Sequence, residues 1–153
     1  MQVTLPPQFE GCTVRRCRKE QCNFGIGRLS SQIIIVDCDL YKQKHNFVDK
    51  ICDFLLFAVD YRQLGIVLEL KGGRLEHIDD IVVQLQNGAN IIVKLAGNVV
   101  SSKSFFAVVL HGGSVHRNEF TLLRKKSVFF KGKAIPLRLG RCGANIREII
   151  DDR

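Results

Sequence analysis

A chain of 153 residues in which 46% are hydrophobic is long enough for one domain with its own core. No stretch approaches the ~18 uninterrupted apolar residues of a membrane span, and the N-terminus lacks a basic region followed by an apolar one. We therefore expect no membrane association and a cytoplasmic protein whose six cysteines are reduced. The net charge of +8 favours an acidic partner, with nucleic acid as the first candidate.

The first 31 residues predict no regular element, and Pro6-Pro7 argues against a helix there. Cys12, Cys17 and Cys22 follow at equal steps, with four basic residues between them. Zinc sites usually pair their ligands in short knuckles, so three evenly spaced cysteines favour ordinary thiols over a zinc site. The intervening basic residues either contact a phosphate backbone or form a solvated face, and the second is the more frequent outcome.

The segment Gln32–Asp37 is apolar and predicts a short buried strand. Asp39 lies two residues beyond its end. This aspartate could cap the next turn or approach a metal site from a neighbouring strand, and the sequence does not decide between the two. Leu40–Lys50 is polar and predicts a loop or one short helical turn.

Two apolar runs between Cys52 and Gly73 predict an antiparallel hairpin, with strands Asp53–Val59 and Ile66–Lys71. The polar residues 61–65 form the turn. If the hairpin folds between positions 62 and 63, paired positions sum to 125, which places Asp53 beside Gly72. Asp53 then lies within a diagonal step of two other charged residues, Glu69 and Lys71, at one end of the hairpin.

Two carboxylates and a lysine at the end of an apolar hairpin suggest a metal site. Carboxylate oxygens suit the hard ions Mg²⁺ and Mn²⁺. A metal held there can activate water and neutralise the charge that builds on a phosphate. Lys71 could orient or deprotonate the water, or stabilise the transition state. The alternative is a solvated strand end with an ordinary ion pair between Glu69 and Lys71.

The pattern Asp-x15-Glu-Leu-Lys, on a hairpin and before a helix, resembles the PD-(D/E)XK nuclease superfamily. The resemblance implies a metal-dependent phosphodiesterase in which Asp53, Glu69 and the backbone carbonyl of Leu70 hold Mg²⁺ or Mn²⁺. It implies that Lys71 is the catalytic lysine. The residue before Asp53 is Cys52, where the motif has proline.

Apolar residues recur at steps of three and four through Leu75–Leu95, which predicts an amphipathic helix that packs on the sheet. One nuclease subgroup carries a Gln-x-x-x-Tyr motif on this helix. Gln84 matches its glutamine, and Gly88 stands at the tyrosine position. The resemblance therefore adds Gln84 to the catalytic residues. On the helical wheel Gln84 lies well away from the apolar stripe, which is also where an exposed amide would lie.

Phe105–Leu110 predicts a strand buried on both faces, parallel to the second hairpin strand. Further strands are expected at Phe120–Leu123, Val128–Phe130 and Ile135–Leu139, and a final short helix at Ala144–Asp151. The densest basic region lies among them. Its residues either bind a nucleic-acid backbone or form a solvated sheet edge; the five candidates are Arg124, Lys125, Lys126, Lys131 and Lys133.

The element order predicts a single α/β or α+β domain with a mixed central sheet flanked by helices. The resemblance implies a restriction-endonuclease-like core and a Mg²⁺- or Mn²⁺-dependent nuclease, with DNA favoured over RNA as substrate. A role in phage defence or DNA repair follows by analogy alone. Specificity would be low, or would come from a homodimer or a partner protein. The alternative is a catalytically inactive subunit that binds nucleic acid or protein, and a small zinc module is a third, weaker hypothesis.

Overall fold

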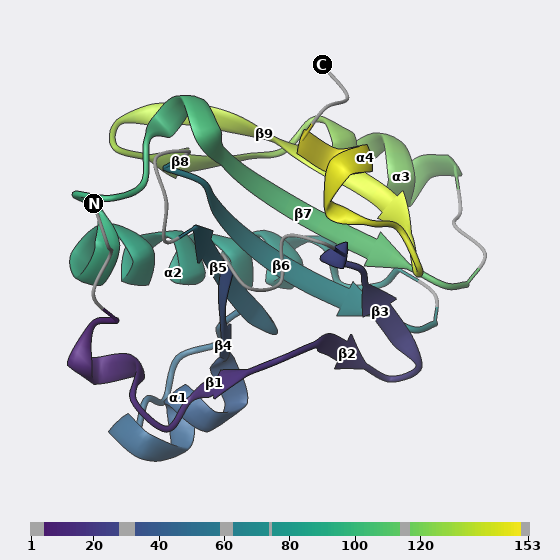
Figure 1. Ribbon diagram of the computed structural model, residues 1–153. Helices are drawn as coiled ribbons and strands as arrows, with labels where there is room; N and C mark the ends of the chain where they lie inside the picture. The colour runs from purple at the N-terminus through teal and green to yellow at the C-terminus, as the bar shows by residue number, and fades with distance from the viewer. Residues whose placement is uncertain (1–4, 28–32, 59–62, 74, 114–116, 151–153) are drawn as a thin grey trace.

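A mixed β-sheet forms the centre of the molecule (Figure 1). The computed structural model describes residues 5–27, 33–58, 63–73, 75–113 and 117–150. Within these ranges the sheet has seven strands. In spatial order they are β1 (Thr13–Val14), β4 (Ile33–Asp37), β5 (Phe54–Ala58), β6 (Gly65–Lys71), β7 (Phe105–His111), β9 (Lys133–Arg141) and β8 (Ser127–Phe130).

The predicted mixture of strand directions is confirmed. β4, β5 and β6 form an antiparallel meander, β7 runs parallel to β6, and β9 runs parallel to β7. The helix α2 (Ile78–Ala96) connects β6 to β7, as the periodic apolar residues predict. The C-terminal ends of β6 and β7 therefore meet at one edge of the sheet, where Lys71 pairs with His111.

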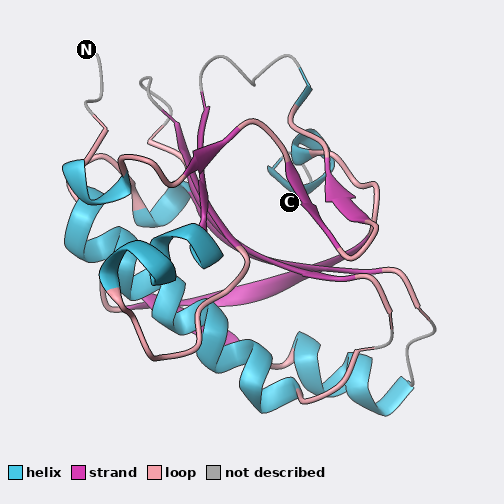
Figure 2. Cartoon of the chain, turned by 90° about the horizontal axis from the view of Figure 1, so that it is seen from below, coloured by secondary structure: helices cyan, strands magenta, loops and turns pink. Residues whose placement is uncertain are grey.

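The two faces of the sheet carry different layers. Most helices gather on one side of the curved sheet (Figure 2). On that side α1 (Cys38–His45), α2 and α3 (Arg117–Arg124) cover alternate strand residues such as Leu55 and Val67. On the other side the small hairpin of β2 (Cys17–Lys19) and β3 (Cys22–Phe24), together with α4 (Ile146–Ile150), covers the remaining residues. Short 3-10 turns occupy Pro7–Phe9 and Ser102–Ser104. Among the described helices, none combines the length and apolar character needed to cross a bilayer.

Three local predictions are wrong. The segment Phe120–Leu123 is part of α3 rather than a strand: Thr121 and Leu122 are both exposed and Leu123 is buried, which breaks the alternation of a strand and fits one face of a helix. Where a loop or one short helical turn is predicted after β4, the chain forms the longer, eight-residue helix α1. Residues 1–31, where no element is predicted, contain β1, β2 and β3. The outer residues Gln32, Val59 and Asp151 of three predicted elements lie outside the described ranges.

The predicted register of the hairpin is also wrong. Phe54 pairs with Leu68 and Phe57 with Gly65, so paired positions sum to 122 rather than 125. Continued by one residue, this register places Asp53 opposite Glu69 rather than Gly72. The physical reason is Gly65, which belongs to β6 and not to the turn. A Cβ there would lie 2.5 Å from Val100, so the glycine leaves room for a packed side chain. Residues 61 and 62 of the predicted turn lie outside the described ranges.

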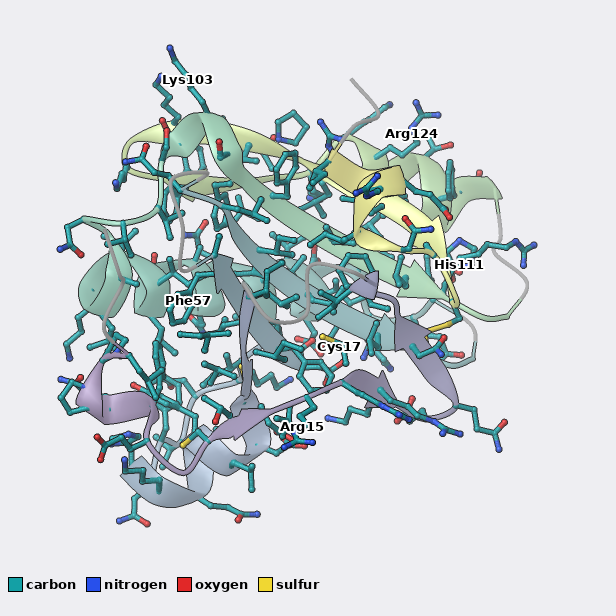
Figure 3. The ribbon with its side chains drawn as sticks, viewed as in Figure 1. Arg15, Cys17, Phe57, Lys103, His111 and Arg124 are labelled. Atoms are coloured by element: carbon teal, nitrogen blue, oxygen red, sulfur yellow. A yellow bond between two sulfur atoms is a disulfide. The ribbon has the colours of Figure 1, made fainter. Side chains whose placement is uncertain are left out.

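The cysteines are not all reduced thiols. Cys22 and Cys142, 120 residues apart in sequence, form a disulfide, which corrects the expectation for this pair. Cys12, Cys17, Cys38 and Cys52 are free and buried. The disulfide joins β3 to the segment after β9 and so ties the β2–β3 hairpin to the end of the sheet where β6 and β7 terminate (Figure 3).

Gly88 lets α2 approach the sheet closely. A Cβ at this position would lie 2.5 Å from the Cys52 sulfur and 3.1 Å from a Leu55 methyl group. The tyrosine that the subgroup motif places here therefore has no room. Gly88 therefore sets the distance between α2 and the strands β5 and β6. Because Gln84 is on α2, Gly88 also sets the distance of Gln84 from these strands.

We predict that Gly88→Ala destabilises the protein even though alanine favours helices. Alanine gains about 1 kcal/mol of helix propensity, but a Cβ 2.5 Å from the Cys52 sulfur places the overpacking cost in the upper part of the usual range of about 1–3 kcal/mol, which leaves a net loss of about 1–2 kcal/mol. Urea denaturation measures the free energy of unfolding. The control is Val83→Ala on the exposed face of α2, where we expect a change within about 0.5 kcal/mol. A Gly88→Ala protein as stable as the wild type would contradict the close packing.

Candidate functional site

Asp53 and Glu69 hold each other in place at the end of the β5–β6 pair. The backbone N–H of Asp53 donates to Glu69 Oε1 at 3.1 Å. The backbone N–H of Leu70 donates to Asp53 Oδ2 at 2.7 Å. Each carboxylate is thus fixed by the backbone of the opposite strand. This arrangement requires the observed register, in which the two residues are neighbours across the pair.

Lys71 and Gln84 complete the surroundings of Glu69. Lys71 Nζ lies 3.2 Å from Glu69 Oε2. With its amide nitrogen turned toward the carboxylate, Gln84 donates to the same oxygen at 2.8 Å. Gln84 is therefore not the freely exposed amide that the helical wheel allows. The structure brings together the side chains of Asp53, Glu69, Lys71 and Gln84, whereas Leu70 takes part through its N–H.

Cys52 stands where the motif of the superfamily has proline, and its backbone N–H makes a hydrogen bond to α2. Its backbone N–H donates to the carbonyl oxygen of Gln84 at 3.0 Å. Proline has no N–H and could not make this bond. Cys52 thus links the strand that carries Asp53 to the turn of α2 that carries Gln84.

Glu69 is a buried carboxyl group with an unusual affinity for a proton. Its side chain is 1% exposed. Burial, followed by the negative charge of Asp53 and a hydrogen bond to it, raises the pKa of Glu69 to about 8, while Lys71 acts in the opposite direction. The ion pair with Lys71 does not compensate for the desolvation of the carboxylate. A proton or another positive charge is therefore favoured at this carboxyl group.

A second lysine, Lys19, binds Asp53 from the β2–β3 hairpin. Lys19 Nζ lies 2.8 Å from Asp53 Oδ1 and 3.1 Å from Asp39 Oδ2. Burial lowers the pKa of Lys19, but its hydrogen bonds and attraction to Asp53 and Asp39 outweigh this and raise the pKa above its ordinary value. Asp39 is free for this role because Asp37 caps α1, accepting from the N–H groups of Asp39 and Leu40.

Sequence reasoning missed the role of Lys19 because the contact depends on long-range docking of the hairpin. The turn between β2 and β3 gives no clear signal either. Glu20 and Gln21 both have positive φ, at 52° and 63°, where a hairpin turn usually carries asparagine or glycine. The basic run from Arg15 to Lys19 was the one available hint.

A cleft of about 300 Å³ opens beside the carboxylates. Lys71 lines it from the end of β6, and Asp80, Ile81 and Gln84 line it from the first turns of α2. The residues that line it are Lys50, Lys71, Glu76, His77, Asp80, Ile81 and Gln84. Lys50 and Asp80 form an ion pair at 3.2 Å within this lining. The cleft gives a ligand access to Lys71, whereas Glu69 lies beneath.

The five predicted nucleic-acid-binding residues do not gather in one place. Lys131 donates to the Val100 carbonyl just beyond α2, at the end of the sheet where β7 begins. In Figure 3, Lys103 marks that end, and His111 marks the opposite end beside Lys71. Lys133 begins β9 at the same distant end. Arg124 ends α3 and Lys125 follows it, both exposed, and Lys126 Nζ lies 3.8 Å from Asp79 Oδ1 near the start of α2.

The N-terminal cysteines do not converge on a zinc ion. Cys22 is in the disulfide. Cys12 packs with the helices on one face of the sheet, and Cys17 packs on the other. Burial raises the pKa of Cys17 to about 12, so this group is held as a thiol. A zinc site built from these three residues does not form.

The chemistry of the carboxylates fits the metal that the resemblance implies. Across the part of the chain that the structure describes, no three His, Cys, Asp or Glu side chains group closely enough to form a ready-made metal site. Asp53 Oδ1 and Glu69 Oε2 are instead paired with the Lys19 and Lys71 ammonium groups, and burial raises the pKa of Glu69, which favours a proton there. Carboxylate oxygens are hard donors, which Mg²⁺ and Mn²⁺ prefer as ligands. A divalent cation would take the place of Lys19 and of this proton.

Comparisons of the chain with protein-family models, with curated proteins and with solved structures found no match. The functional assignment of this site therefore depends on the geometry and chemistry of the residues themselves.

We predict that Glu69 makes stability depend on pH. The folded protein holds this proton more tightly than the unfolded chain, so the contribution of neutral Glu69 is complete below about pH 4.5 and is lost as the pH rises through about 8. In EDTA, the free energy of unfolding should fall with a slope of up to about 1.4 kcal/mol per pH unit in this window. Glu69→Gln keeps a neutral side chain of the same shape and should flatten the slope. Parallel pH profiles for both proteins would contradict the assignment.

Proposed function

We propose that the protein is a metal-dependent nuclease that hydrolyses phosphodiester bonds, with DNA as its substrate and Mg²⁺ or Mn²⁺ as its cofactor. The observation that carries the proposal is the convergence of Asp53, Glu69, Lys71 and Gln84 at one end of β6, beside an open cleft. We further propose that β4 to β7 and α2 are a restriction-endonuclease-like core.

Each of the four side chains has a proposed role that follows from its position in the site. Asp53 and Glu69 supply the carboxylate oxygens that would hold the cation, with the Leu70 carbonyl as the proposed third donor. The cation would supply an activated water and neutralise charge on the phosphate. Lys71 reaches the cleft with 32% of its side chain exposed, so it can orient the attacking water or contact the phosphate. Gln84 fixes the Glu69 carboxyl group by its hydrogen bond.

The charge of the chain agrees with a polyanionic substrate. A net charge of +8 attracts DNA over a distance, while the carboxylates are confined to a buried end of the sheet. The single domain leaves little room for a separate sequence-reading module. Specificity would therefore be low or would come from a second copy or a partner protein. We propose a role in phage defence or DNA repair by analogy with the superfamily.

The ion pair between Lys19 and Asp53 favours a second candidate function. In a catalytically inactive subunit, lysines would neutralise the carboxylates permanently, and the chain would bind nucleic acid or protein through its basic surface. Such binding would weaken with salt and would not need Asp53 or Lys71.

We expect the wild type to cut supercoiled plasmid or single-stranded DNA in Mg²⁺ or Mn²⁺ and to stop cutting in EDTA. Asp53→Asn and Lys71→Ala should each lower the rate by about 100-fold or more, because they remove a cation-binding oxygen and a group that acts on the reacting phosphate. Gel assays of nicked and linear products give the rates.

Lys103→Ala is the matched control, since it removes an equal charge from an exposed residue at the far end of the sheet (Figure 3) and should retain near wild-type cleavage. Wild-type protein that is inert, or variants that cut as fast as the wild type, would overturn the catalytic proposal. Salt-sensitive DNA binding that both variants retain would then support the non-catalytic subunit.

A further inference from the structure

Lys19 occupies the position at Asp53 that a metal ion would need. Its ammonium group bridges Asp53 Oδ1 and Asp39 Oδ2, two carboxylates from different elements. The Asp53 carboxyl group is 10% exposed and that of Asp39 63% exposed, so the bridge lies at the boundary between the buried site and solvent. The remaining oxygen of Asp53 accepts from the Leu70 N–H. Both oxygens of Asp53 are therefore occupied by donors from the chain itself.

The fold holds Lys19 at this position. Lys19 ends β2 opposite Cys22, whose disulfide to Cys142 attaches the hairpin next to the end of β7. The hairpin turn lies directly on the end of β6, because a Cβ on Gly72 would be only 2.0 Å from the Glu20 carbonyl oxygen. The backbone of the hairpin is thus fixed against the strand that carries Glu69 and Lys71, while the Lys19 side chain can turn outward.

Electrostatics makes Lys19 and a divalent cation alternatives. When Asp39, Asp53 and Glu69 are ionised, they and Lys71 together carry two net negative charges, which one divalent cation neutralises. Lys19 adds a positive charge within hydrogen-bonding distance of Asp53. Two cations at this separation repel each other strongly where solvent is mostly excluded.

We propose that Lys19 is a built-in competitor of the metal ion, which keeps Asp53 ion-paired until a divalent cation displaces it. The inference rests on the proposed nuclease site and adds a residue from outside its motif. Because the hairpin backbone is fixed at the edge of the site, the displaced Lys19 ammonium group stays close by and can bind a phosphate of the substrate. Nucleic acid that binds Lys19 would in turn make the cation bind more tightly, because such coupling is reciprocal.

Isothermal titration of the EDTA-treated 153-residue chain with Mn²⁺ tests this competition without any cleavage. Lys19→Gln should bind Mn²⁺ roughly tenfold more tightly than the wild type, because it removes the opposing charge. Lys19→Arg keeps the charge and should bind as weakly as the wild type. Thermal unfolding without metal shows that each variant is folded before the titration.

Arg18→Gln is the matched control. It removes the same charge from the adjacent residue of β2, which is exposed, and should change the dissociation constant by less than about twofold. Asp53→Asn, combined with Lys19→Gln, identifies the site. The double variant should lose the tighter Mn²⁺ binding that Lys19→Gln shows.

The outcomes separate the two proposals. If the wild type binds Mn²⁺ in an Asp53-dependent way and Lys19→Gln binds it no more tightly, the competition is overturned and the nuclease proposal stands. If neither the wild type nor Lys19→Gln binds Mn²⁺ at millimolar concentration, both proposals fail. A tighter but Asp53-independent site in Lys19→Gln would also overturn the competition.

Discussion

The burial of the Glu69 carboxyl group is the constraint on which the site depends. A carboxylate that is 1% exposed loses most of its hydration, so its surroundings must supply hydrogen bonds or positive charge. The Asp53 N–H, the Gln84 amide and the Lys71 ammonium group do so from three different elements. These groups still leave Glu69 with a raised pKa, and hence with an affinity for further positive charge. A buried acid of this kind, beside a cleft, is typical of functional sites.

Two backbone features bring the three elements together. The register of β5 and β6 sets Asp53 opposite Glu69, and Gly88 with the Cys52 N–H sets the distance of α2 from these strands. The sheet supplies the carboxylates and the helix supplies the amide, as expected when a crossover helix packs on parallel strands. The β2–β3 hairpin then closes the opposite side with Lys19. The site is therefore assembled from segments that are distant in sequence but adjacent at one edge of the sheet.

The sequence predicts the elements with strong periodicity and fails where tertiary contacts decide. The continuous apolar runs of β5, β6 and β7 and the apolar stripe of α2 are visible because burial imposes a simple pattern. The register of the hairpin was misjudged because Gly65 was interpreted as a turn residue, whereas it makes room for Val100. The spacing of Asp53, Glu69 and Lys71 identified the site residues. Lys19 and the disulfide of Cys22 were not predictable, because both depend on a short hairpin that docks across the sheet.

If Asp53 and Glu69 form a cation site, Lys19 must withdraw from Asp53 when the cation binds. Anomalous diffraction from crystals soaked in Mn²⁺ tests this directly. We predict an anomalous peak within about 2.2 Å of a carboxylate oxygen of each residue, with the Lys19 ammonium group no longer in contact with Asp53. A protein that binds Mn²⁺ elsewhere, or that shows no peak while Lys19 still contacts Asp53, would contradict it.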